Sequence, residues 1–401
     1  MSNTKSNSRM VVGSICASLL LGTLGAHAAN LPPEPNNAAL LYYQAFLLCP
    51  DPCDLPVWFG QIFRHDWAQY MGKCREYMKD YQDMIQLVEA ASKVPHCNWA
   101  IPYLQGPKVR PKQGKKLLLI LNLIGANVHI LAADGNYRDA LSESLLLRRV
   151  ARHLADDPDA LEGLIARVEW DALSNVCVVL GVMPPDKETL IALREQLDAE
   201  PLITELFPGR IKQDFQWLIR TIKRTGTTTL SDLRNDLTEN AKNEAQKNKV
   251  MALTDDELLT LIQESYAGYL DSAFDVMGSQ MSYEQKYVRL DDMVQQYWER
   301  AKTNPEIILA LRLRAGKVLS CYSMGINHVA LLNAINASIE IYLLKATSGR
   351  LPEALPEGLP KDPFSGKDFE YSATKEGFVL RCRAKEITSG DVRQYEFKVQ
   401  E

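Results

Sequence analysis

The run of apolar residues at 117–133 is the sequence feature that most constrains how this chain can fold. A helix that is apolar on all sides has to be buried, and its neighbours must cover it with the apolar faces of amphipathic helices. The chain supplies such neighbours directly after the run: a turn at 134–136 is followed by two more helical patterns, which a break at 156–158 separates. The stretch at 116–180 therefore predicts the centre of a helical bundle.

The same run has an alternative interpretation as a membrane-spanning helix. It is only 17 residues long, however, and it contains Asn122, Asn127 and His129. Polar side chains of this kind are costly in lipid, and a span needs about 20 residues. We therefore expect a helix buried inside the protein.

Apolar residues at helical spacing recur through most of the rest of the chain, with proline, glycine and capping residues between the segments. The last fifty residues change to the alternation that is typical of strands, at 369–371, 377–382 and 395–399. These patterns predict a mainly α fold, a multi-helix bundle of antiparallel helical hairpins, with a small C-terminal antiparallel β module that makes the last part α+β.

Changes in composition predict the domain boundaries, and 401 residues are enough for two or three domains or subdomains. Residues 225–253 are polar nearly all round, so we expect an exposed helix or a mobile connection there. The predicted parts are a signal peptide at 1–28, an N-terminal helical domain at 29–224, this connecting segment at 225–253, a second helical subdomain at 254–347, and a β-rich module at 348–401 packed on a helix at 322–347.

The N-terminus has the order of parts that is typical of a secretory signal peptide. Lys5 and Arg9 precede an apolar segment at 10–24, and the small-x-small sequence at 26–28 follows it. We expect cleavage after Ala28 and export to the periplasm or cell envelope; the alternative is an uncleaved membrane anchor. Cleavage would leave 43 basic and 50 acidic residues without any basic run, so we expect no nucleic-acid partner and no membrane span in the mature chain.

Common catalytic motifs are missing from the chain, which has no G-x-S-x-G, P-loop, G-x-G-x-x-G or H-E-x-x-H sequence. The only adjacent imidazole and carboxylate are those of His65 and Asp66. Together with His96, they are the candidate catalytic residues of a periplasmic hydrolase with a site between the N-terminal helices. Because sequence neighbours point to different sides of a helix, a structural or surface role is the alternative. We expect no cofactor and no metal.

Four cysteines fall within forty-nine residues of the N-terminal region: Cys49, Cys53, Cys74 and Cys97. In an oxidising compartment such a group predicts up to two disulfides, with three possible pairings. We favour a bond between the first two and a bond between the last two. The alternatives are free thiols, or a metal site that adds His65 or His96, although no C-x-x-C pair is present.

The C-terminal seventy residues resemble the helix-plus-sheet module of the pseudopilins of type II secretion. The matching pieces are 339–342, 349–352, 362–363, 369–371 and 377–380. Pseudopilins begin that helix with a membrane-spanning segment, whereas this chain has some 300 residues upstream of the module. The resemblance therefore implies a shared module and not a shared role in a pilus.

The whole chain also resembles a group of uncharacterised, exported, mostly helical bacterial proteins. The matching parts are the segments 37–43, 95–99, 135–141 and 152–158, followed by the C-terminal module. This resemblance implies the fold and the export, and no activity. With no catalytic motif, the sequence predicts a non-catalytic envelope protein that binds or scaffolds another protein of the envelope, with the hydrolase as the alternative.

Overall fold

The computed structural model describes residues 36–51, 54–56, 58–59, 67–99, 114–156, 162–225, 227–239, 241, 243–301, 304 and 316–399. The predicted signal peptide lies outside these residues. Within them the protein is mainly α-helical and ends in a three-stranded antiparallel sheet, which confirms the predicted fold class.

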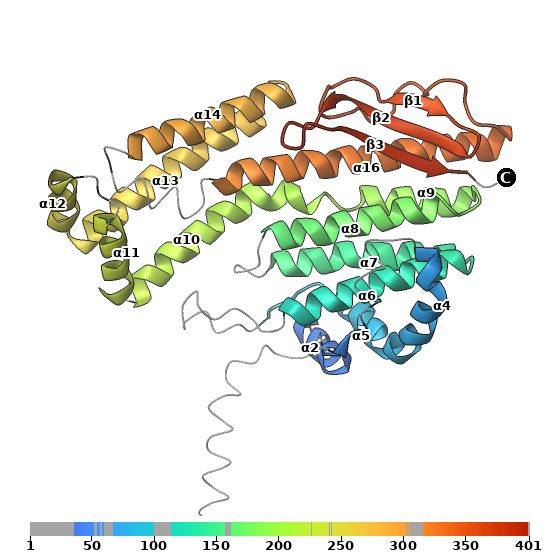
Figure 1. The fold of residues 1–401 in the computed structure, drawn as a ribbon, viewed down its shortest axis with the longest axis horizontal. Coiled ribbons are helices and arrows are strands. Elements are labelled where there is room, and N and C mark those ends of the chain that lie inside the picture. The colour runs from blue at the N-terminus through green and yellow to red at the C-terminus, as the bar shows by residue number, and fades with distance from the viewer. Residues whose placement is uncertain are drawn as a thin grey trace, which may run out of the picture.

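The described elements form a body, which contains the N-terminal helices and the sheet, and an arm that extends from one end of it (Figure 1). The helices of the body are α2 (Ala38–Leu48), α4 (Trp67–Met78), η3 (Lys79–Tyr81), α5 (Gln82–Ser92), α6 (Gly114–Ala133), α7 (Tyr137–Ala155), α8 (Glu162–Leu180), α9 (Lys187–Asp198) and η5 (Ile203–Leu206). The arm consists of α10 (Phe207–Thr225), α11 (Thr227–Glu239), α12 (Glu244–Ala252), α13 (Asp255–Gly278) and α14 (Tyr283–Ala301). The C-terminal part consists of α16 (Gly316–Ser348), β1 (Glu370–Ala373), β2 (Gly377–Lys385) and β3 (Val392–Lys398).

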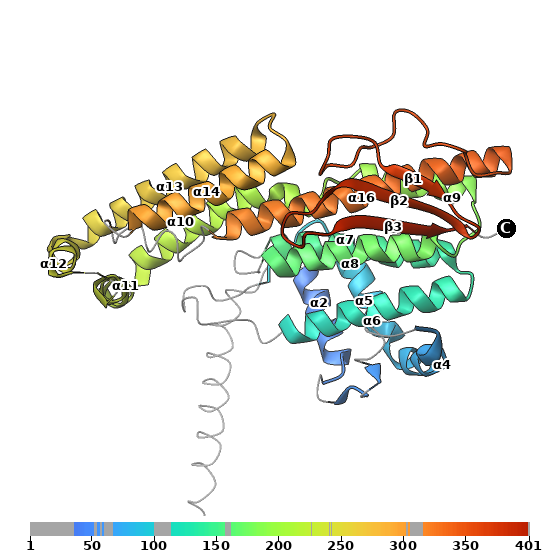
Figure 2. The same ribbon diagram turned by 45° about the horizontal axis from the view of Figure 1, so that its top comes forward.

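The apolar helix α6 lies inside the body, packed against α4, α7 and α8, as Figure 2 shows. Its side chains at Ile120, Leu123 and Val128 are fully buried. Two described helices, Lys115–Ala133 and Lys317–Ser348, are long and apolar enough to cross a membrane, and half or more of each apolar window is buried in this fold. The expectation of a buried helix is therefore confirmed.

The predicted turn between α6 and α7 is a tight C-terminal helix cap. Gly135 has a φ of 79°, a conformation that glycine adopts without steric cost. The N–H of Asn136 donates to the carbonyl of Leu131 (2.9 Å), and the N–H of Gly135 donates to that of Ala132 (3.2 Å). This cap reverses the chain, so that α6 and α7 pack as a helical hairpin.

The polar stretch at 225–253 contributes α11 and α12, which lie at the far end of the arm (Figure 1). Arg234 of α11 donates to the carbonyl oxygens of Val250 and Leu253 (2.7 Å each) and forms an ion pair with Asp255 (2.7 Å). One arginine thus ties α11 to the connection between α12 and α13.

The long helix α16 links the two parts, since it packs on α14 of the arm and on α8, α9 and β3 of the body. The sheet has the order β1-β2-β3 and turns one apolar face inward, with Phe378, Leu380 and Phe397 buried. Tyr342 of α16 contacts the Phe378 ring (5.5 Å between centroids) and donates to the carbonyl of Lys398 (2.7 Å). Aromatic packing and this hydrogen bond hold the sheet on α16.

Two buried carboxylates organise the loops of this C-terminal module. Asp362 accepts from the N–H groups of Phe364 (2.9 Å) and Arg383 (2.8 Å), which accounts for the predicted Asp-Pro turn. Glu386 accepts from the N–H of Ser389 (2.7 Å) and from the hydroxyl of Tyr283 in α14 (3.3 Å). The second carboxylate therefore connects the β2–β3 loop to the arm.

Candidate functional site

A cleft of about 560 Å³ opens where the ends of α5 and α7 meet η5 and the start of α10. Its lining is unusually rich in basic side chains for a chain with a net charge of −5. The lining residues are Ser92, Lys93, Val94, Pro95, Arg149, Arg152, His153, Ala155, Asp156, Glu200, Ile203, Leu206, Gly209, Arg210 and Gln213. We take this cleft as the candidate functional site.

The last two turns of α7 supply the basic side chains at the centre of the cleft. Arg149, Arg152 and His153 are spaced three and four residues apart, so they share one side of the helix. Basic residues in the last turn also match the negative end of the helix dipole, as the acidic Asp139 in the first turn matches the positive end. Arg148 is directed elsewhere, into the protein, where it is only 1% exposed.

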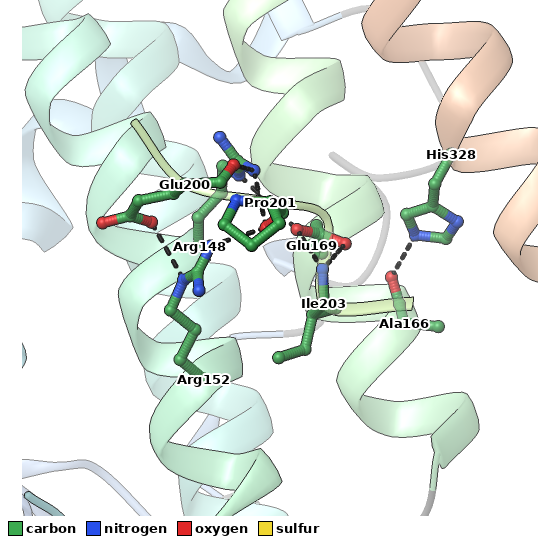
Figure 3. A network of polar contacts seen from close by, with 8 residues as sticks. All are labelled: Arg148, Arg152, Ala166, Glu169, Glu200, Pro201, Ile203 and His328. Carbon is green, nitrogen blue, oxygen red and sulfur yellow. Dashed lines mark hydrogen bonds and ion pairs between the residues drawn. The ribbon is translucent and has the colours of Figure 1, made fainter. Parts of the chain in front are cut away.

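The floor of the cleft is the chain between α9 and η5, and a buried polar network holds it in place (Figure 3). Arg148 donates to the carbonyl of Glu200 (3.0 Å) and pairs with Glu169 of α8 (3.5 Å). The Glu169 carboxylate in turn accepts from the N–H of Ile203 (3.0 Å). From the cleft side, Arg152 pairs with the Glu200 carboxylate (2.9 Å) and donates to the carbonyl of Pro201 (2.6 Å).

The network places two opposite charges almost out of reach of water, since Arg148 and Glu169 are both 1% exposed. Burial raises the pKa of Glu169, while the hydrogen bond from Ile203 and the charge of Arg148 oppose that rise. A buried pair of this kind is costly to break, because a charge left without its partner is not solvated. We therefore assign this pair a structural role.

The wall of the cleft at residues 92–99 is fastened to the start of α2. Asn37 accepts from the N–H of Asn98 (2.8 Å) and donates to its carbonyl (3.0 Å), and the N–H of Ala38 donates to the carbonyl of His96 (2.8 Å). Trp99 stacks on Tyr42 with 5.1 Å between the ring centroids. Three segments that carry the sequence resemblance, 37–43, 95–99 and the start of 152–158, thus meet beside the cleft.

His153 is the histidine that lines the cleft, and both of its ring nitrogens are engaged. Nε2 lies 2.9 Å from the carbonyl of Val94, which can only accept, so Nδ1 accepts from the hydroxyl of Tyr42 at 2.8 Å. Burial lowers the pKa of His153, although the bond to Val94 opposes this effect. Both ring nitrogens thus bond to groups of the protein itself, and the imidazole ties the end of α7 to α2 and to the segment after α5.

Most of the basic groups of the cleft already have partners. Lys93 pairs with Glu89 (2.6 Å), Arg152 pairs with Glu200, and Arg210 donates to the carbonyl of Ala155. Asp156 adds a carboxyl group close to Arg210; burial raises the pKa of Asp156, and the charge of Arg210 opposes only part of that rise.

Arg149 is different. Its Nε donates to the hydroxyl of Ser92 (3.2 Å), and no ion-pair partner for it occurs among the described residues. The cleft therefore carries one arginine that forms no ion pair with the described residues.

The structure does not bring the predicted catalytic residues together in its described part. His65 and Asp66 lie outside the described residues. His96 is exposed and lies near Asp156. The hydrolase site therefore stays a prediction.

The favoured disulfide pairing is not present. Cys49, Cys74 and Cys97 are buried free thiols, and Cys53 lies outside the described residues. Cys74 lies in α4, which packs on α6, whereas Cys97 follows α5 in the segment whose His96 carbonyl accepts from the N–H of Ala38 at the start of α2. The packing thus places the last two cysteines on different elements of the body. In the part of the chain that the structure describes, no group of three or more His, Cys, Asp or Glu is placed to hold a metal ion.

The sequence reasoning missed the arginines of the cleft. The pair Arg148-Arg149, followed by Arg152-His153, was the available signal, because four basic side chains fall within two turns. No local sequence pattern could have assigned Arg210 to this group, because it belongs to another helix, α10. Comparison of the chain with protein-family models, with curated proteins and with solved structures gave no match, so its function has to be inferred from the geometry of the cleft.

Proposed function

We propose that this protein is a non-catalytic component of the cell envelope that binds another protein by holding an acidic segment of it in the cleft. The observation that carries the proposal is Arg149, a permanently charged side chain in a cleft with no acidic partner among the described residues. Charge-assisted hydrogen bonds from such a group to a carboxylate are about twice as strong as neutral ones.

Binding without catalysis fits the other polar groups of the cleft. The cleft histidine bonds to Tyr42 and Val94 within the protein. Arg152 and Arg210 donate to the backbone carbonyls of Pro201 and Ala155 and so hold the surrounding chain in place. The cleft volume is within the range of about 300–1,000 Å³ that is typical of ligand sites. The hydrolase with His65, Asp66 and His96 remains the alternative, and nothing in the described part favours it.

The location in the envelope belongs to the proposal and rests on the signal-peptide pattern at 1–28. The likeness of the C-terminal module to pseudopilins also stays a prediction. It offers a second surface through which an envelope protein of this architecture would scaffold others.

The test compares three immobilised forms of the full chain in extracts of native envelope: the unchanged protein, Arg149→Glu, and Arg167→Glu as control. Arg167 is an exposed arginine of α8 outside the cleft, and it forms an ion pair with Asp171 (3.6 Å). We expect a stoichiometric partner on the unchanged protein and on the control, and loss of this partner on Arg149→Glu. Equal retention on all three forms, or no stoichiometric partner on any, would contradict the proposal.

A further inference from the structure

We propose that the group recognised in the cleft is a single carboxylate with an apolar side chain next to it, as in an acidic residue beside a leucine, and not a phosphate. The inference rests on the proposed function and specifies its ligand. The geometry of Arg149, the count of charges around it and the apolar walls of the cleft each support it.

One hydrogen bond, from Nε, holds the guanidinium of Arg149 in place, and its two terminal nitrogens remain available to a ligand. Its Nε donates to the Ser92 hydroxyl (3.2 Å), and that hydroxyl is itself fixed because it donates to the carbonyl of Glu89 (2.8 Å). Ser92 is 5% exposed, so this anchor is rigid. The two terminal nitrogens make no hydrogen bond to the described residues, and their planar geometry matches the two oxygens of a carboxylate.

The charge count favours a ligand with one negative charge. Lys93 is compensated by Glu89, and Arg152 is compensated by Glu200. A carboxylate would bring one negative charge to Arg149 and leave the cleft balanced. A phosphate brings about −1.5 to −2 at neutral pH, and the excess would lie beside the existing carboxylates of Glu200 and Asp156.

Apolar groups on two sides of the cleft provide a place for the neighbouring side chain. Val94 and Pro95 line one side, and Ile203 and Leu206 line the other. Leu206 is 47% exposed, so part of its apolar surface is open to a ligand in the cleft. An apolar side chain of the ligand would cover it and remove its surface from water.

The experiment selects peptides from a phage-displayed random library on the full chain and, in parallel, on Arg149→Ala. We expect the selected peptides to contain Asp or Glu next to an apolar residue on the unchanged protein and to lose this pattern on the variant. Selection of peptides without acidic residues, or of the same peptides on both proteins, would overturn the inference.

Calorimetry with synthetic versions of a selected peptide then tests the carboxylate, its single charge and the guanidinium geometry one at a time. Replacing its acidic residue by the amide should weaken binding on the order of tenfold. Replacing it by phosphoserine should not strengthen binding, and tighter binding of the phosphopeptide would overturn the preference for one charge. The affinity of Arg149→Lys for the peptide should lie between those of the unchanged protein and Arg149→Ala. The lysine ammonium keeps the positive charge but lacks the two parallel N–H donors of a guanidinium.

The two proposals fail differently in these tests. If the envelope partner depends on Arg149 while the selected peptides show no carboxylate preference, the specified ligand is wrong and the binding function stands. If neither the partner nor the peptides depend on Arg149, both proposals are wrong.

Discussion

Arg148 and Arg149 are neighbours in the chain, but among the described residues only Arg148 forms an ion pair. Arg148 is buried and matched by Glu169 and by the carbonyl of Glu200. Arg149 faces the cleft and donates a hydrogen bond to the hydroxyl of Ser92. A charge inside a protein must be matched if the fold is to persist, whereas an unmatched charge is tolerated only where water or a ligand can reach it. The difference therefore separates an arginine that supports the fold from one that is available for binding.

The largest effect on stability should come from breaking the buried pair. Glu169→Ala leaves the Arg148 charge buried without its partner, and we expect a loss of about 3–5 kcal/mol in the free energy of unfolding. Urea unfolding followed by circular dichroism measures it. The double variant Arg148→Met with Glu169→Leu is the control, because it removes both charges and should recover much of the loss. A single variant as stable as the unchanged protein would contradict the structural role of the pair.

A smaller loss is expected where a neutral buried contact is broken beside the cleft. Tyr42→Phe removes the hydroxyl that donates to His153 and leaves a buried nitrogen without its donor. We expect a loss of about 1–3 kcal/mol in the free energy of unfolding. Tyr297→Phe in the arm is the matched control, since its hydroxyl makes no hydrogen bond to the described residues. Equal losses in the two variants would show that the contact with His153 contributes nothing specific.

Glu386 tests how much hydrogen-bond donors stabilise a buried carboxylate whose ion-pair partner, Arg393, lies 3.9 Å away. Burial acts to raise the pKa of Glu386, but the hydrogen bonds from Thr388 and Ser389 outweigh it and lower the pKa to about 2. Because the folded-state pKa lies below the ordinary value of about 4.5, the ionised group adds stability above that value and loses its contribution as the pH falls toward 2.

Thermal unfolding of Glu386→Gln should therefore show a lower melting temperature than the unchanged protein at pH 6. The difference should shrink steadily between pH 4.5 and 2. A difference that stays constant over this range would mean that ionisation of Glu386 does not contribute to the fold.

The smallest effect on stability is expected at Arg149. It is partly exposed and forms no ion pair in the described part, so Arg149→Ala should change the free energy of unfolding by no more than about 0.5 kcal/mol. Binding of an acidic peptide should nevertheless fall on the order of tenfold. A large loss of stability in Arg149→Ala would remove the contrast between the two arginines.

Patterns that act over a few residues were sufficient for much of the fold. The apolar run at 117–133 predicted a buried helix, and Gly135 predicted the turn behind it. The strands of the last fifty residues were also predictable from the sequence. In each case the deciding interaction lies within one or two turns of helix or one strand, so the sequence contains its physical cause.

The partners of charged and polar side chains could be known only from the packed fold. Glu169 lies twenty-one positions after Arg148, and Trp99 donates to the carbonyl of a residue fifty-four positions later. The same long-range packing places Cys74 on α4 against α6 and Cys97 in the segment after α5, and both are free thiols, against the expected pairing. Helical spacing puts Arg148 and Arg149 on different sides of α7, and only the neighbouring helices decide that one side is core and the other a cleft. Burial depends on what covers a face, and the covering segments are distant in the chain.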